Sequence, residues 1–127
     1  MKNILIVDDD AMLQSLIRDA LNCEFDIETA CNGQQALEFI VNNRFDLIIT
    51  DLVMPELNGI ELVMKLQETN PKQKVIAISG GGGINGRFDY LSVAQLIGAC
   101  KILRKPFSIV ELRNVIEETL QESPKKH

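Results

Sequence analysis

Five polar residues have the side-chain types needed for phosphoryl chemistry, and each follows or ends a short apolar run. They are Asp8, Asp9, Asp51, Ser79 and Lys105. Clustered carboxylates repel one another, and a hard divalent cation such as Mg²⁺ relieves that repulsion through oxygen ligands. A lysine adds a mobile positive charge, and a serine hydroxyl adds a donor to an anionic oxygen. Such a group can form an acyl phosphate on one carboxylate, with the positive charges stabilising the phosphoryl oxygens.

Three apolar runs and a shorter one of two residues must position these residues, and the three longer runs are typical of a strand buried on both faces. The runs are continuous and rich in β-branched residues, without alternation of apolar and polar positions. They cover residues 4–7, 47–50, 75–78 and 102–103. Because the carboxyl ends of parallel strands share one edge of a sheet, the polar residues at those ends are expected to converge.

Asp51 is the candidate nucleophile because it ends the run 47–50 and precedes an uncharged segment that stops at Pro55. An aspartate in this setting is also common as the cap of the following turn. The other four residues have local alternatives too: the start of a helix, the cap of a strand end, or a solvated surface side chain. Their arrangement at four strand ends favours a shared site over separate local roles.

Apolar residues at helical spacing predict a helix after each strand. A shorter, more polar strand at residues 25–30 is expected at a sheet edge, and Ser108 and Glu111 have the spacing of a capping box. The predicted helices cover residues 11–22, 33–42, 60–69, 88–98 and 109–120. Five strands alternating with five helices predict an α/β fold, with a parallel sheet between two helical layers and right-handed crossovers.

The chain length and composition predict one soluble domain of residues 1–122 with a short polar tail at 123–127. No apolar run approaches the length of a membrane span and no secretion signal is visible, so we expect a cytoplasmic protein without membrane insertion. The net charge of −5 argues against direct binding of nucleic acid.

The number and positions of the histidine and cysteine residues limit which kinds of catalytic and metal site the chain can form. The single histidine, His127, disfavours a zinc site and excludes a Ser-His or Cys-His triad. The three cysteines have no CxxC spacing, and we expect them to be reduced residues in or near the core. They are Cys23, Cys31 and Cys100.

In the order and spacing of its motifs, the chain resembles the receiver domain of bacterial two-component response regulators, over residues 1 to about 122. The motifs that carry the resemblance are residues 4–10, 46–55, 58–59, 78–80, 98–99 and 105–107. The resemblance implies a flavodoxin-like doubly wound (βα)5 fold, a three-layer sandwich with parallel sheet order 2-1-3-4-5. It also implies that Asp51 accepts a phosphoryl group from a sensor histidine kinase or a histidine phosphotransfer protein.

The resemblance also implies the metal ligands. Asp9, Asp51 and the backbone carbonyl of Val53 would bind Mg²⁺ directly, and Asp8 would contribute through water.

Two further residues have roles that the resemblance implies. Lys105 would contact the phosphoryl group, and its bond to Pro106 would be cis. Ser79 would move toward the phosphoryl group and pull the following loop with it. The surface of the fourth helix, fifth strand and fifth helix would then change its binding to an unknown downstream protein. The chain would thus be a signalling switch rather than an enzyme, a stand-alone receiver or an excised one, and a monomer or a weak phosphorylation-dependent dimer.

Three features depart from the usual receiver pattern. Ile102 stands where many receivers carry an aromatic switch residue, and the glycine-rich segment 80–86 lengthens the connection after Ser79. Val53 and Gly81, two residues beyond Asp51 and Ser79, cannot orient a water through their side chains. We therefore expect a comparatively long-lived phosphorylated form.

Two other functions remain open from the residues. A Mg²⁺-dependent aspartyl-phosphate phosphohydrolase would use the same carboxylates, but such enzymes commonly need an acidic residue where this chain has Val53. A flavin or nucleotide binder would use the glycine-rich segment, which lacks the Gly-Lys-Ser/Thr of a phosphate-binding loop.

Overall fold

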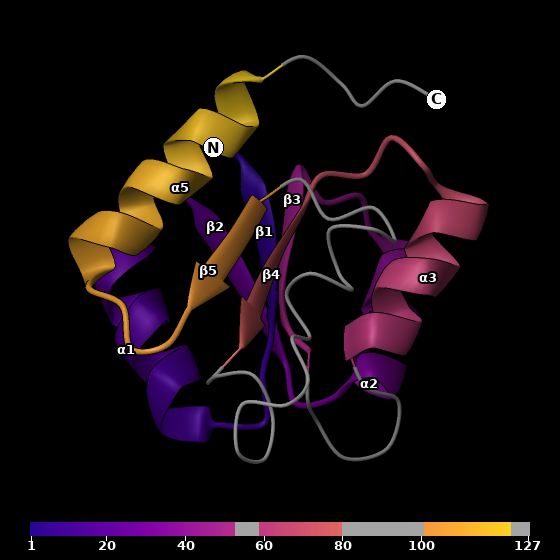
Figure 1. Cartoon of the computed structure of the whole chain (residues 1–127), viewed down its shortest axis with the longest axis horizontal. Coiled ribbons are helices and arrows are strands. Elements are labelled where there is room, and N and C mark those ends of the chain that lie inside the picture. The colour runs from indigo at the N-terminus through magenta and orange to yellow at the C-terminus, as the bar shows by residue number, and fades with distance from the viewer. Residues whose placement is uncertain (53–58, 80–100, 123–127) are drawn as a thin grey trace.

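A five-stranded parallel sheet forms the centre of the molecule, with strand order β2-β1-β3-β4-β5 (Figure 1). The computed structural model describes residues 1–52, 59–79 and 101–122. The strands are β1 (Asn3–Val7), β2 (Asp26–Ala30), β3 (Leu47–Asp51), β4 (Val75–Ser79) and β5 (Lys101–Arg104). The predicted strand order is confirmed, and the more polar strand β2 lies at an edge as expected.

Helices cover both faces of the sheet, with α1 and α5 on one side and α2 and α3 on the other (Figure 1). Their bounds are α1 (Ala11–Leu21), α2 (Gly33–Asn42), α3 (Gly59–Thr69) and α5 (Ile109–Gln121). The helix predicted at 88–98 and the glycine-rich segment 80–86 lie outside the described residues. The three-layer α/β sandwich is confirmed.

The core has two parts because side chains of the central strands alternate between the two faces. In β1, Ile4 and Ile6 pack under α1 and α5, whereas Leu5 and Val7 pack under α2 and α3. All four are at most 1% exposed. Full burial of one such side chain contributes roughly 1.5–3 kcal/mol, so the apolar run 4–7 can only be satisfied in a central strand.

Two helices begin at capping side chains, and these caps fix where the loops at the site end. Asp10 caps α1, and its carboxylate accepts hydrogen bonds from the backbone N–H groups of Met12 and Leu13. Ser108 caps α5, and the predicted capping box with Glu111 is present. Both loops therefore turn into their helices directly after the strand-end residues.

One expectation about side-chain location is wrong, and two apolar residues of α1 are exposed. Cys23 and Cys31 are free and exposed rather than buried, because they lie in the turns that follow α1 and β2; Cys100 lies outside the described residues. Met12 and Leu16, which contribute to the apolar periodicity of α1, are 84% and 57% exposed. The face of α1 that packs on the sheet is instead formed around Ile17 and Leu21.

Among the helices that the structure describes, none is both long and apolar enough to cross a lipid bilayer.

Candidate functional site

The register of the sheet brings the carboxyl ends of four strands to one edge. Val7 of β1 pairs with Thr50 of β3, so Asp8 and Asp51 both follow directly after paired positions. Ser79 of β4 pairs with Arg104 of β5, the residue before Lys105. The convergence predicted from the four apolar runs is therefore present in the backbone.

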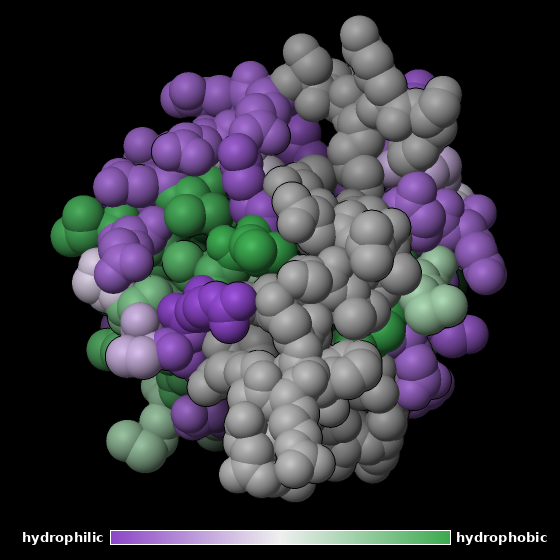
Figure 2. Space-filling view, in the orientation of Figure 1, coloured by the Kyte–Doolittle hydropathy of each residue, from purple (hydrophilic) through white to green (hydrophobic). Residues whose placement is uncertain are grey.

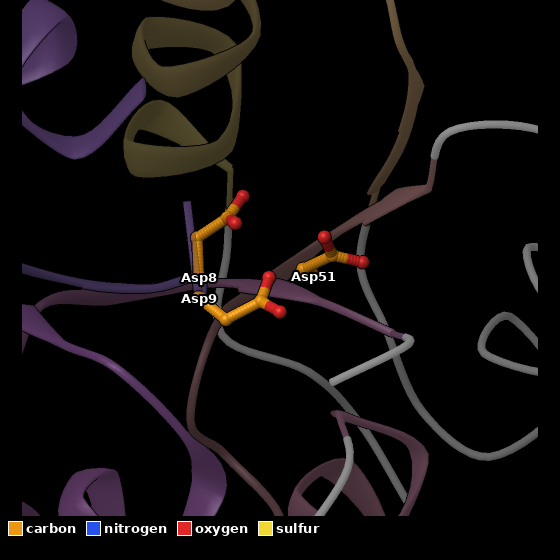
Figure 3. A group of neighbouring side chains, drawn as sticks. All are labelled: Asp8, Asp9 and Asp51. Atoms are coloured by element: carbon orange, nitrogen blue, oxygen red, sulfur yellow. The ribbon is translucent and has the colours of Figure 1, made fainter. Parts of the chain in front are cut away.

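Three carboxylates lie side by side at this edge: those of Asp8, Asp9 and Asp51 (Figure 3). One oxygen from each lies within 4.8 Å of the others. Asp8 and Asp51 are only 2% and 7% exposed, whereas Asp9 is exposed. Two of the three negative charges are thus withdrawn from water, and a group of this kind is suited to a hard cation that prefers oxygen ligands.

Lys105 supplies the positive charge within this cluster. Its Nζ donates to Asp51 Oδ2 at 3.1 Å and to Asp8 Oδ2 at 3.2 Å. Burial alone would lower the pKa of the Lys105 ammonium, but the hydrogen bond and charge of Asp51, followed by those of Asp8, raise it above its usual value. The ammonium is therefore fully charged at neutral pH. The Lys105–Pro106 bond is cis, as the resemblance implied.

The surroundings of Asp8 disfavour the charged form of its carboxyl group. Burial raises the pKa of its carboxyl group above the usual value, and the negative charge of Asp51 adds to the rise. A hydrogen bond from the Asp10 N–H to Asp8 Oδ1 at 2.9 Å and the nearby Lys105 ammonium act in the opposite direction without cancelling it. The site therefore favours additional positive charge beside Asp8.

The backbone of Asp51 is held from two sides. The buried Thr50 hydroxyl donates to the Asp51 carbonyl at 2.9 Å. Gly59, the first residue of α3, lies so close that an added Cβ would meet that carbonyl oxygen at 1.9 Å. The start of α3 and the end of β3 are thus in direct backbone contact, which only a glycine permits at position 59.

Gln14 is part of this region but was not anticipated from the sequence. Its side chain is 8% exposed, and Nε2 donates to the carbonyl oxygens of Asp8 and Ala30, both at 2.7 Å. A sequence signal did exist: Gln14 lies three and seven residues before Ile17 and Leu21, so all three share the buried face of α1. A polar residue on the apolar face of a helix points to a specific partner.

Other predicted site residues are described only in part or not at all. For Ser79 the structure gives the backbone in β4 but not the side chain, and Val53 and Gly81 lie outside the described residues. Ile102 of β5 is 38% exposed.

Comparison with known proteins places this site in a family. A sequence model described as the response regulator receiver domain matches residues 4–117. Sporulation initiation phosphotransferase F of Bacillus subtilis is 30% identical over 120 residues, which cover 94% of both chains. The response regulator receiver protein CpdR of Brucella abortus is 33% identical over 121 residues, covering 94% of this chain and 98% of CpdR.

Longer relatives contain a similar segment. Response regulator MprA of Mycobacterium sp. is 33% identical over 110 residues, and these cover 86% of this chain but 46% of MprA. The chain therefore spans about half the length of these relatives.

Solved structures agree with the sequence comparison. The receiver domain of Francisella response regulator 1452 superposes with a TM-score of 0.84 at 29% identity, covering 95% of this chain and 98% of that one. A receiver domain protein from Clostridium thermocellum gives 0.84 at 28% identity, covering 94% of each chain. Receiver domains act as signalling switches that interact with histidine kinases or phosphotransfer proteins. This chain belongs to the response regulator receiver domain family, the phosphoacceptor modules of two-component systems.

Proposed function

We propose that Asp51 is the residue of this receiver that accepts the phosphoryl group. The observation that carries the proposal is the position of the Lys105 ammonium, 3.1 Å from Asp51 and 3.2 Å from Asp8. In the transfer, an Asp51 carboxylate oxygen forms a bond to phosphorus while the bond from phosphorus to the donor's histidine nitrogen breaks. The released imidazole keeps the electron pair of the broken bond.

Lys105 is suited to stabilise the transferred group. Its ammonium bridges two buried carboxylates, so it is already partly withdrawn from water and lies close to the reacting oxygen. When the phosphoryl group arrives, the same ammonium can contact one of its oxygens with little rearrangement. Asp8 then retains a hydrogen bond from the Asp10 N–H, which supports its charge when Lys105 turns away.

The carboxylate group fits Mg²⁺, and we propose that Asp9 and Asp51 bind it directly while Asp8 contributes through water. The fit rests on three oxygen donors from separate residues within 4.8 Å of one another, two of them buried, and on the raised pKa of Asp8. Mg²⁺ would neutralise negative charge on the phosphoryl oxygens. The backbone carbonyl of Val53, a further proposed ligand, lies outside the described residues.

The output of the switch is proposed to pass through Ser79 toward the surface around β5 and α5. Ser79 stands beside Arg104 in the sheet, so a movement at the end of β4 reaches the neighbouring strand directly. Ile102 replaces an aromatic switch residue, and its partial exposure leaves an aliphatic side chain at that surface. The third element of this surface, the helix expected at 88–98, lies outside the described residues.

Apolar side chains are exposed on α1 and α5, where the left of Figure 2 shows hydrophobic and hydrophilic residues mixed, and these side chains suit the phosphoryl donor. Met12 and Leu16 of α1 and Val110 of α5 are exposed, by 84%, 57% and 62% respectively. Met12 lies in the first turn of α1, three residues after Asp9, and Val110 lies in the first turn of α5, five residues after Lys105. We propose that a histidine kinase or phosphotransfer protein packs on these side chains while its phosphohistidine reaches Asp51. A downstream protein, and any weak phosphorylation-dependent dimer, would use the surface around β5 and α5.

We also propose that the domain ends at residue 122, that the protein is cytoplasmic, and that it loses the phosphoryl group slowly. Apart from the transfer of the phosphoryl group to Asp51, the chain would catalyse only the removal of that group from itself. A phosphohydrolase remains the alternative from the sequence, but position 53 lacks the acidic side chain that such an enzyme commonly needs.

Intact-mass measurement with Mg²⁺ and acetyl phosphate tests the proposal. The unaltered chain should gain about 80 Da, the mass expected when a phosphoryl group replaces a proton on a carboxylate. Asp51→Asn should gain nothing because the amide is a poor nucleophile. Asp46→Asn is the matched control: Asp46 is exposed, and its carboxylate accepts from the Asn3 N–H at the opposite edge of the sheet. An adduct that persists in Asp51→Asn would place the acceptor elsewhere.

A further inference from the structure

The side-chain amide of Gln14 connects three elements at the site edge of the sheet. It projects from α1, and its Nε2 donates to the last carbonyl of β2, at Ala30, and to the carbonyl of Asp8, both at 2.7 Å. An amide nitrogen carries two hydrogens, so one nitrogen can satisfy both carbonyls at once. These are among the shortest hydrogen bonds in the described part of the chain, and the side chain is 8% exposed.

The hydrogen bonds of Gln14 help to fix the backbone of Asp8, the residue that precedes Asp9. The Asp8 N–H donates to the Ala30 carbonyl at 3.1 Å, which is the same oxygen that accepts from Gln14. The peptide groups on both sides of Asp8 are therefore fixed, one by Ala30 and the other by Gln14. With both fixed, the direction in which the Asp8 side chain leaves the backbone is fixed, and so is the position of the Asp9 Cα.

We propose that Gln14 is a positioning residue for the cation and phosphoryl site. It acts through the Asp8 peptide, holding the carboxylates of Asp8 and Asp9 at the spacing that a cation shared with Asp51 requires. This inference rests on the proposed function of the site. Residues that orient metal ligands through a hydrogen bond typically alter metal affinity or activity by about 10- to 100-fold when changed.

A purely structural role must be separated from this positioning role, and the chain offers a matched residue. Gln73 is 9% exposed, and its Nε2 also donates to two carbonyl oxygens, those of Phe45 and Lys74, both at 3.1 Å. Phe45 and Lys74 precede β3 and β4, so Gln73 lies at the opposite edge of the sheet from Asp51. Removal of either amide takes one donor from two carbonyls, of which one keeps a backbone donor: the Asp8 N–H at Ala30, or the Ile48 N–H at Lys74. The two removals are thus closely matched, but only Gln14 lies beside the carboxylates.

The test compares Gln14→Met with Gln73→Met, since methionine keeps the length of the side chain and removes both donors. Three quantities are measured: the midpoint of urea unfolding without metal, the affinity for Mg²⁺ from an NMR titration of the unphosphorylated chain, and the rate of phosphorylation by acetyl phosphate. Both variants should unfold at lower urea than the unaltered chain. Only Gln14→Met should weaken Mg²⁺ binding and slow phosphorylation, each by about 10-fold.

A second measurement needs no substitution and decides the matter if Gln14→Met does not fold. In the unaltered chain, Mg²⁺ should shift the side-chain amide resonances of Gln14 and leave those of Gln73 in place. Equal Mg²⁺ affinity in both variants, or an unmoved Gln14 amide, would overturn the positioning role while the unaltered chain still takes up Mg²⁺ and phosphoryl groups. If the unaltered chain takes up neither, the proposed function falls and the role of Gln14 falls with it.

Discussion

Substitution of Gly59 by alanine tests whether the backbone contact between α3 and β3 holds Asp51 in place. The added Cβ would lie 1.9 Å from the Asp51 carbonyl oxygen, 2.7 Å from Leu52 Cα and 2.8 Å from the Asp51 carbonyl carbon. All three atoms belong to the backbone at the end of a buried strand, so no side-chain rotation can relieve the overlap. The start of α3 or the end of β3 must move by about 1 Å before the contact becomes tolerable.

Two opposing effects determine the stability of Gly59→Ala. Overpacking of a well-packed interior costs roughly 1–3 kcal/mol. Alanine is favoured over glycine in a helix interior by about 1 kcal/mol, but Gly59 is the first residue of α3, where the gain is smaller. The steric term therefore dominates, and we expect the free energy of unfolding to fall by about 2 kcal/mol.

The movement should also reach the chemistry, because the clashing atoms belong to Asp51 itself. A displacement of about 1 Å in a reacting group can reduce a rate by about 100-fold, so phosphorylation by acetyl phosphate should slow by about 10- to 100-fold. Urea unfolding and intact-mass kinetics measure the two effects. Lys65→Ala, an exposed position in the same helix, serves as the control and should retain both properties. Unchanged stability and rate in Gly59→Ala would refute the proposed role of the contact.

Three further variants give separate outcomes. Burial raises the pKa of Asp8 in the folded chain, so its negative charge lowers the free energy of unfolding above that pKa and has no effect below the unfolded value of 3.8. Asp8→Asn should therefore stabilise the metal-free chain at pH 7. In urea titrations with EDTA, this gain in stability should shrink as the pH falls toward 3.8. Ser108→Ala removes the cap of α5 and should lower the free energy of unfolding by about 1 kcal/mol in urea, whereas an unchanged midpoint would mean that the cap contributes nothing. Val53→Asn together with Gly81→Glu should accelerate loss of the phosphoryl group measured by intact mass, and an unchanged rate would contradict the expected slow hydrolysis.

The strands of the sheet and the residues at their ends could be predicted because the residue pattern of each strand can be recognised by itself. A continuous apolar run such as 4–7 or 47–50 is satisfied only with both faces covered, and the residue that follows it is then placed at the sheet edge. Asp8, Asp51 and Lys105 were located by this reasoning alone, although it could not give the contacts of the Lys105 ammonium.

Residues were missed where the fold, rather than the local pattern, decides burial. Gln14 is polar yet buried because two strand-end carbonyls lie opposite it, and those belong to segments that only tertiary structure brings together. Met12 and Leu16 fit the helical period but lie toward solvent, because the sheet contacts only one side of α1. Cys23 and Cys31 are exposed because they lie in turns, where the general tendency of cysteine to be buried has no effect.

The hydrogen bonds of Lys105 join residues that are far apart in the chain. They span 97 residues to Asp8 and 54 to Asp51, and both require β5 to be paired with β4. During synthesis, Asp8 and Asp51 are made before Lys105, so the positive charge is the last of the three to become available. The last strand to be added therefore brings the counter-charge, and a ligand that needs both signs of charge binds only the completed sheet. Occupation of the site should accordingly slow unfolding by retaining β5 at its edge.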